Sequence, residues 1–331
     1  MTTASPLQVH CRLGHPPLPN LKKLVPSLSR ISSLECESYQ FGKHSRSSFP
    51  SRVSKRANFP FSVVHLNVWG PSRVSCKQGF HYFVTFIDDF SRTTWLYLMK
   101  ACSKLFTVFT TFCAEIRTQF NVHVRVLRSD NALEYLSSAF KSYMASHGIL
   151  HQTSCPGTPQ QNGVAERKNR HLIETTCMLL LHMHVPVQYW DDVVLTACYL
   201  MNQMPSPVLN DQIPYSVLFP RVDLYSIPPR IFGSTYFVHH LALGRDKLSS
   251  CSFKCVFLGY SCLQKGYCCY SPKLDHYFVS ADATFFESSP YFLLSSELFE
   301  SVSTGLPLPV PFLDLSFAPP PSASRLDCLD L

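Results

Sequence analysis

The sequence predicts an α/β domain built on a mixed sheet, followed by a small β domain. Between residues 59 and 182, β-branched apolar runs alternate with segments of helical periodicity, which is typical of α/β folds. After residue 230, only short strand-like runs separated by turn residues remain. From Gly305 the chain becomes rich in Pro and Ser, which favours a disordered tail.

The order of the expected elements defines the first domain. Strands are predicted at residues 61–69, 80–87, 93–99, 122–127 and 149–153, and helices at 103–119, 133–146, 160–181 and 186–204. Hairpin strands come first and crossover connections follow, so the sheet should mix antiparallel and parallel pairs. This element order is that of the RNase H-like fold, with helices flanking the sheet.

The second domain should be a small β-barrel. Its strands are predicted at residues 235–239, 254–260, 266–270 and 276–279, after a loop-like segment at 205–229. The expected organisation is therefore an N-terminal module with a basic arm, a core, a helical extension with linker, a β domain and a tail; the boundaries are 1–54, 55–182, 183–229, 230–292 and 293–331.

Positive charge concentrates at the N-terminus. The chain has a formal net charge of +7. Residues 1–60 hold nine Lys or Arg against Glu35 and Glu37, so this segment alone has a net charge of 9 − 2 = +7. Such an arm suits a polyanion such as nucleic acid, or it is a solvated basic linker. The 14 cysteines have no regular disulfide spacing, and neither a signal peptide nor a membrane span is evident. We therefore expect an intracellular protein with mostly free thiols and no membrane contact.

Two carboxylates point to metal-dependent chemistry on nucleic acid. Asp130 follows a predicted strand in RSDNALEY, and Glu166 lies early in a helix that is rich in Arg167, Lys168 and Arg170. Catalytic groups of α/β sheets gather at the carboxyl ends of strands. An acid within a basic helix can bind a divalent metal while its neighbours contact DNA phosphates.

Several motifs together resemble the integrase of Ty1/copia retrotransposons, from about His10 to Phe292. They are FIDDFSRTTWLYLM, SDN…EY, TPQQNGVAERKNR, YLMNQMPSPVL and FVHHLALGRDKLSSCSFKCVFLGYSCLQKGYCCYSP. The resemblance implies an RNase H-like integrase core and an SH3-like β domain. It also implies a carboxylate triad with two Mg²⁺ or Mn²⁺ ions, which performs 3′-processing and strand transfer of element DNA into a target.

The first acid of that triad is missing. The family motif is similar to HxDxWGP, whereas this chain reads His65-Leu-Asn67-Val-Trp-Gly-Pro71. Asn67 offers a neutral oxygen where a carboxylate would bridge two mutually repelling ions, so we expect metal affinity and turnover to fall severely. Asp88 and Asp89 are nearby, and we interpret them as acids at the entry to a loop.

The N-terminal module resembles the family's His-His-Cys-Cys zinc site in degraded form. His10, His15 and Cys36 match three ligands, but Tyr39 replaces the fourth. Structural zinc prefers four ligands, and a phenol is a poor substitute at neutral pH. Cys11, next to His10, could offer a replacement thiolate.

The resemblance also implies partners. Arg167, Lys168 and Arg170 should contact phosphate. Gln161 and Asn162, with Gln160, should either contact DNA or cap the helix. A homo-oligomer and a nuclear location follow for a functional copy.

The alternatives to a functional integrase are a non-catalytic nucleic-acid-binding module and an unexpressed relic. The hypothesis of a decaying genomic copy is supported by Asn67, Tyr39, Cys11 and Cys268. A single-nucleotide change caused by cytosine deamination could have produced each of these residues. The start and end of the chain also suggest a fragment of a longer polyprotein.

Overall fold

The computed structural model describes residues 4–42, 56–130, 132, 135, 137–153, 162–225, 227–239, 251–261 and 264–292. Gln160, Gln161 and the predicted tail lie outside the described residues. None of the helices within these described ranges has both the length and the apolar content that a membrane-spanning helix requires.

The core sheet has the mixed direction that the sequence predicts. Its strand order is β3-β2-β1-β4-β5, and the first three strands pair antiparallel while β4 and β5 run parallel to β1. The bounds are β1 Val63–Trp69, β2 Tyr82–Asp88, β3 Thr94–Met99, β4 Val126–Ser129 and β5 Leu150–Thr153. The observed β4 begins four residues after its predicted start at Val122, because only its last residues find partners on β1 and β5.

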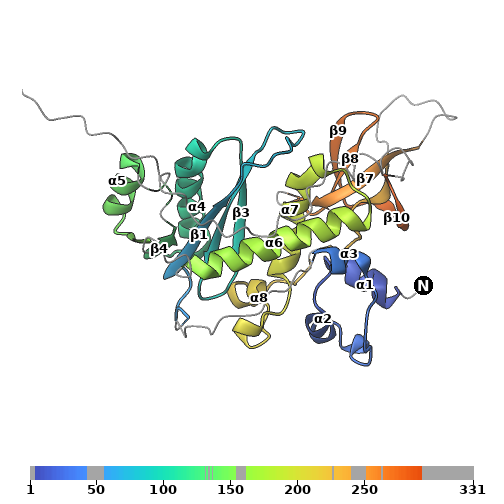
Figure 1. Cartoon of the computed structure of the whole chain (residues 1–331), viewed down its shortest axis with the longest axis horizontal. Coiled ribbons are helices and arrows are strands. Elements are labelled where there is room, and N and C mark those ends of the chain that lie inside the picture. The colour runs from blue at the N-terminus through green and yellow to red at the C-terminus, as the bar shows by residue number, and fades with distance from the viewer. Residues whose placement is uncertain are drawn as a thin grey trace, which may run out of the picture. The chain divides into compact units, whose positions relative to one another are not determined.

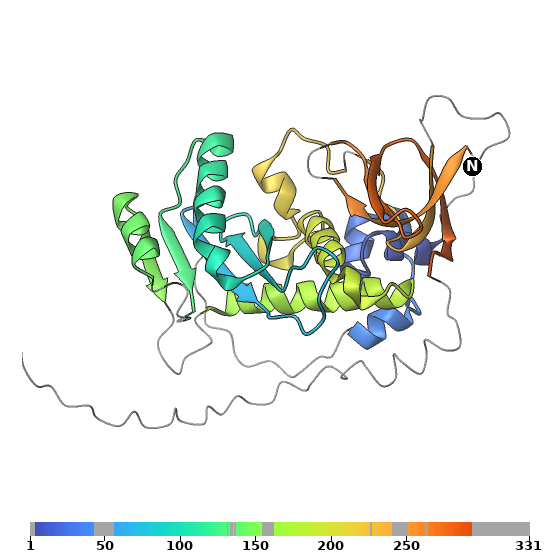
Figure 2. The same ribbon diagram turned by 90° about the horizontal axis from the view of Figure 1, so that it is seen from above.

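Helices cover both faces of this sheet (Figure 1). Helix α4 (Leu105–Phe120) packs Phe109, Phe112 and Ile116 against Leu66, Phe86 and other apolar residues of one face. Helix α6 (Gly163–His182) lies across the opposite face, where it contacts β1 and β2. Figure 2 shows α4 and α6 on opposite sides of the strands. Alternate residues of β1 therefore face an apolar core and a polar helix.

Helices α5 and α7 complete the core. Helix α5 (Ser138–Ser146) starts with a Ser137 side-chain cap, and α7 (Trp190–Asn202) follows a short 3₁₀ turn, η5 (Val187–Tyr189). The three tryptophans lie in apolar surroundings, as expected: Trp69 stacks on Phe83, Trp95 meets Phe61 and Phe112, and Trp190 is 5% exposed.

The segment predicted as a loop at 205–229 contains short helices. They are η6 (Pro207–Leu209) and α8 (Pro214–Leu218). Proline at the first helical position explains both, because its missing N–H is not needed there.

The N-terminal module is helical, and it packs against the core instead of extending from it as a basic arm. Its elements are α1 (Pro6–Arg12), α2 (Leu18–Leu24), η1 (Pro26–Leu28) and α3 (Glu37–Gly42), and α3 packs against α6 (Figure 1). Arg12 pairs with Glu287 and Lys23 pairs with Asp211. These two charges therefore serve folded contacts. Lys43, Arg46, Arg52 and Lys55 of the expected arm lie outside the described residues.

The β domain is a five-stranded antiparallel sheet in the order β10-β6-β7-β8-β9. Its strands are β6 Ser234–His239, β7 Ser252–Tyr260, β8 Tyr267–Ser271, β9 His276–Ser280 and β10 Ala283–Pro290. The last strand was not predicted. It pairs with β6, where Phe285 packs edge-on against Tyr236 and Tyr267, so its stability comes from a distant strand.

Candidate functional site

The predicted site residues gather where α6 crosses the polar face of the sheet. On β1 and β4, the parallel register pairs Val63 with Val126 and His65 with Arg128. Continuing this register by two residues sets Asn67 level with Asp130 on the same face. Asn67 also pairs with Thr85 on β2, whose hydroxyl lies 2.8 Å from Oδ1 of Asn169 on α6. Strand positions 67 and 130 therefore both face α6.

Helix α6 brings Glu166 to this face. Asn162 and Asn169, one turn on either side, bind the sheet, since Nδ2 of Asn162 lies 3.4 Å from the Leu66 carbonyl. Partial burial raises the pKa of Glu166, and the negative charge of Asp130 raises it further, while Arg170 and Arg167 oppose the shift. Two carboxylates that repel each other are a donor set that suits a divalent cation.

The third acid is not supplied by a neighbour. Among the described residues, no group of three His, Cys, Asp or Glu ligand atoms forms around Asp130 and Glu166. Asp88 pairs with Val64, three positions along β1 from Asn67, so it lies about 10 Å away along the strand. Within the part of the chain that the structure describes, the predicted metal site therefore gains no third carboxylate beside Asp130 and Glu166.

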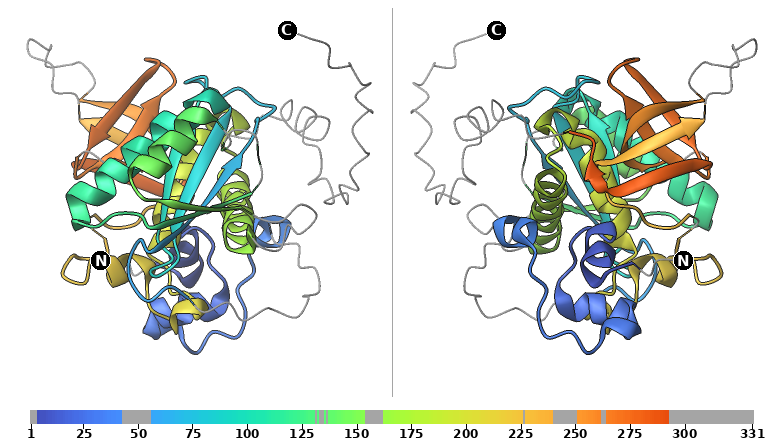
Figure 3. Two further views of the ribbon diagram at one scale, coloured as in Figure 1. Left: turned by 90° about the vertical axis from the view of Figure 1, so that its left-hand side faces the viewer. Right: turned by 90° about the vertical axis from the view of Figure 1, so that its right-hand side faces the viewer.

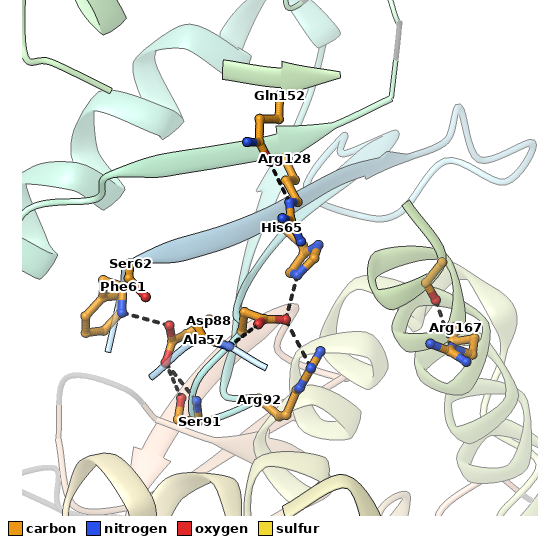
Figure 4. A network of polar contacts seen from close by, with 12 residues as sticks. Ala57, Phe61, Ser62, His65, Asp88, Ser91, Arg92, Arg128, Gln152 and Arg167 are labelled. Carbon is orange, nitrogen blue, oxygen red and sulfur yellow. Dashed lines mark hydrogen bonds and ion pairs between the residues drawn. The ribbon is translucent and has the colours of Figure 1, made fainter. Parts of the chain in front are cut away.

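Asp88 and Asp89 make a separate set of buried polar contacts, and Figure 4 shows Asp88 with its partners Phe61 and Ser91. Asp88 accepts hydrogen bonds from the Phe61 and Ser91 backbone N–H groups and the Ser91 hydroxyl. Asp89 lies 2.8 Å from Nε2 of His65, 3.0 Å from Arg92 and 2.7 Å from the Ala57 amide. Burial raises the pKa of Asp89, but the bonds from His65 and Ala57 and the Arg92 charge outweigh it and lower the pKa to about 2.

Removing the Asp89 charge should destabilise the fold. The lowered pKa means that ionised Asp89 stabilises the folded chain above pH 4, and that this contribution is lost as the pH falls through about 2. Asp89→Asn should lower the free energy of unfolding by about 2–3 kcal/mol at pH 7. Urea unfolding measures this, with Asp223→Asn, an exposed carboxylate, as the control. Equal effects of the two changes would contradict the assignment.

The predicted phosphate-binding residues differ in exposure. Arg167 and Arg170 are exposed on α6, and Nε of Arg167 donates to the Gly163 carbonyl at 2.9 Å. Lys168 is half-buried near Cys198 of α7, and burial lowers its pKa, so it is the least suited of the three to contact DNA. Asn162 is 2% exposed and makes no side-chain capping bond. The capping alternative for its side chain is thus wrong, and it ties the start of α6 to β1 instead.

The N-terminal residues also come together. The ligand atoms of His10, His15 and Cys36 all lie within 4.8 Å of one another, with His15 Nδ1 3.1 Å from the Cys36 sulfur. All three side chains are buried, and the Tyr39 ring meets His10 edge-on at 6.0 Å between centroids. Sequence reasoning missed His182, which ends α6 and lies 4.9 Å from the His15 ring. No local signal could have found it, because the two residues are far apart in the chain.

Family models match three parts of the chain. A GAG-pre-integrase domain matches residues 2–44, an integrase core domain matches residues 58–159, and a retroviral polymerase SH3-like domain matches residues 234–297. Together with the mixed sheet and its helices, these matches define the class: an integrase core of RNase H-like fold, followed by an SH3-like domain.

The relatives define the group more narrowly. The chain is 36% identical over 302 residues to the retrovirus-related Pol polyprotein from transposon TNT 1-94 of Nicotiana tabacum, covering 90% of this chain and 22% of that protein. It is 34% identical over 258 residues to the one from transposon RE1 of Arabidopsis thaliana, covering 76% and 17%. The chain belongs with these copia-type Pol polyproteins, as its motifs indicated, and spans about a fifth of their length.

A solved structure of an HTLV-2 integrase catalytic core domain in complex with magnesium is also similar. It is 17% identical, with a TM-score of 0.37, and the match covers 49% of this chain and 99% of that chain. Integrase core domains as a family depend on divalent metal ions.

Proposed function

We propose that this chain is the DNA-binding and catalytic region of a retroelement integrase whose metal site has lost one carboxylate. The observation that supports this most directly is the convergence of Asp130 and Glu166 on the face that carries Asn67. In this class of site, a divalent ion bound by carboxylates activates the attacking water or 3′-hydroxyl and stabilises the leaving oxygen. The substrates would be element DNA ends and a target duplex.

Each residue of the proposed metal site would have a separate role. Asp130 and Glu166 would hold the metal, and Asn67 would contribute a neutral oxygen in place of the bridging acid. Because an amide carries no charge, the site would hold a pair of ions weakly and react slowly. The proposal includes Mg²⁺ or Mn²⁺ as cofactor, action as a homo-oligomer, and a nuclear location for a functional copy.

Binding of DNA without catalysis is the second candidate function. It is favoured by the loss at Asn67 together with the exposed Arg167 and Arg170 on α6, since phosphate contacts require no metal ion. In this case, the chain would bind DNA with strong salt dependence and leave it chemically unchanged.

DNA binding should depend on the exposed arginines. Arg167→Ala and Arg170→Ala should each weaken binding of a DNA-end duplex about fivefold to tenfold near 0.1 M salt, and lower the salt slope by about 0.9. Lys168→Ala should have a smaller effect, because Lys168 is half-buried. Fluorescence anisotropy over a salt series measures both quantities.

The matched control is Arg117→Ala. Arg117 is exposed on α4, which covers the opposite face of the sheet, so its removal should leave affinity and slope unchanged (Figure 3). If Arg117→Ala weakens binding as much as Arg167→Ala, then DNA does not bind along α6. If neither wild type nor variants bind DNA, both candidate functions fail.

A further inference from the structure

Part of the sheet face that carries the proposed metal site lies open. Strand β5 is the edge strand beside β4, whereas α6 packs on β1 and β2 further inward. Leu150 and Gln152 of β5 point to the same side of the sheet as Arg128 of β4, which pairs with Gln152. Leu150 is 58% exposed, and Gln152 is exposed as well. Of the helices that the structure describes, none therefore covers β5 on this side.

A row of polar side chains crosses this face next to the proposed metal site. Arg128 pairs with His65 on β1 and with Gln152 on β5. Leu127 is fully buried in the apolar core against α4, so Arg128 points to the opposite side, as Asp130 does. The row lies two residues before Asp130, which is about 6–7 Å along the strand. Figure 4 shows Gln152, Arg128 and His65 following one another across the three strands.

The positive charge of Arg128 is not matched within this row. Its Nε donates to Oε1 of the neutral Gln152 side chain at 2.9 Å, and no carboxylate in the described ranges forms an ion pair with it. Asp89, at the other end of the row, already pairs with Arg92 at 3.0 Å and with His65 at 2.8 Å. A guanidinium has five N–H donors, so most of those of Arg128 are available to an anion. Arg128 is half-buried, and a bound anion would offset the cost of that burial.

Further positive charge borders the row. Burial lowers the pKa of Arg92, the charge of Asp89 opposes this shift, and the charges of Arg56 and Arg167 add to it. Arg56 and Arg167 are therefore near enough to Arg92 to repel it. The positive charge thus extends from β4 to the start of α6, which is a distribution that suits a long polyanion better than a single small anion.

We propose that Arg128 binds a backbone phosphate of the DNA strand that enters the metal site, and that Gln152 holds its guanidinium toward that strand. This role rests on the proposed function, and it adds a contact on the sheet to the contacts expected on α6. The planar guanidinium can donate two parallel N–H bonds to the oxygens of one phosphate. The phosphate would supply the opposite charge that the protein does not. The DNA path would then cross β4 and β5, where the sheet is open.

The first test measures binding of a short blunt-ended DNA duplex to the full chain by fluorescence anisotropy over a salt series, without metal ions. Arg128→Gln should weaken binding about fivefold to tenfold near 0.1 M salt and lower the salt slope by about 0.9, because one phosphate contact is lost. Arg128→Lys should keep the slope but weaken binding about threefold, since an ammonium lacks the planar fork. The matched control is Arg125→Gln, at an exposed arginine three residues earlier, which should change neither quantity.

Gln152→Glu separates phosphate binding from a purely structural role. The new carboxylate would pair with Arg128 across the two strands, so the fold should be as stable in urea as wild type, while DNA binding should weaken about tenfold. A structural role alone predicts unchanged DNA binding. Gln152→Glu should have a smaller effect when Arg128 is already Gln, because its target is then absent. Gln119→Glu, at an exposed glutamine of α4, is the control for added negative charge.

The outcomes distinguish this role from the proposed function. If Arg128→Gln and Gln152→Glu bind DNA as wild type does, while Arg167→Ala weakens binding, then Arg128 does not contact phosphate and the proposed function stands. If the wild-type chain binds no DNA, the proposed function fails and the role of Arg128 fails with it. Gln152→Glu retains a bond between β4 and β5, so it decides the question even if Arg128→Gln does not fold.

Discussion

Asn67→Asp should increase Mn²⁺-dependent joining of DNA ends by at least about 1000-fold over the chain with Asn67. Extending the β1–β4 register by two residues beyond His65 and Arg128 places position 67 level with Asp130, and α6 brings Glu166 to the same face. A carboxylate at position 67 would complete three acids on one face and offset the repulsion between two bound ions. A strand-transfer assay on a DNA-end mimic measures the effect, and single-turnover conditions report the chemical step.

The matched controls remove a different acid. Asn67→Asp combined with Glu166→Gln, or with Asp130→Asn, should be as inactive as the starting chain, because each again leaves two carboxylates. Adding Tyr39→Cys to Asn67→Asp tests whether the N-terminal module limits the reaction. If the chain with Asn67 joins DNA at a similar rate, then Asn67 is not the disabling change and the proposed account of the metal site is wrong.

Asp192→Asn should stabilise the fold by about 2–4 kcal/mol at pH 8. Asp192 lies in the first turn of α7, where burial, and then the charge of Asp191, raise its pKa to about 7. In the unfolded chain it ionises near pH 4, whereas the folded chain keeps it neutral until about pH 7. Wild-type stability is therefore lost as the pH rises from about 4 to about 7, and Asn removes this loss.

The hydrogen bond at this position survives the substitution. The Tyr277 hydroxyl, on β9, donates to Oδ2 of Asp192 at 2.7 Å, and an amide oxygen can accept the same bond. Urea unfolding at pH 8 and pH 4 should show the gain at pH 8 and little change at pH 4. Asp282→Asn, at an exposed carboxylate, is the control and should change stability by less than about 0.5 kcal/mol at either pH. A gain of the same size at both pH values would show that ionisation of Asp192 is not its cause.

The sequence determined the type and order of the core elements, because hydrophobic period and turn residues act locally. The observed β1, β2, β3, α4 and α6 fall close to their predicted ranges, and the mixed strand direction is confirmed. The family and the substitution at Asn67 were also readable from the motifs alone. The helices α1 to α3, the short α8 and the strand β10 were missed. Segments this short have weak periodicity, and their packing partners stabilise them more than their own propensity does.

The assignment of Asp130 and Glu166 as a pair rested on the strand end before Asp130, on the basic helix around Glu166 and on the motif resemblance, since the spacing of 35 residues between them is weak evidence by itself. Only the tertiary structure supplies the β1–β4 register, whose extension beyond His65 and Arg128 sets Asn67 level with Asp130, and shows that α6 crosses the same face. The tertiary structure also shows that Asp88 bonds to Ser91, and that Asp89 bonds to His65 and pairs with Arg92. It further shows that Lys168 is half-buried beside α7. Finally, it brings His182 to Cys11 across 171 positions of sequence. The residue types in the sequence show which chemistry each position can perform. Contacts between residues this far apart in the chain depend on tertiary packing, which local sequence patterns do not predict.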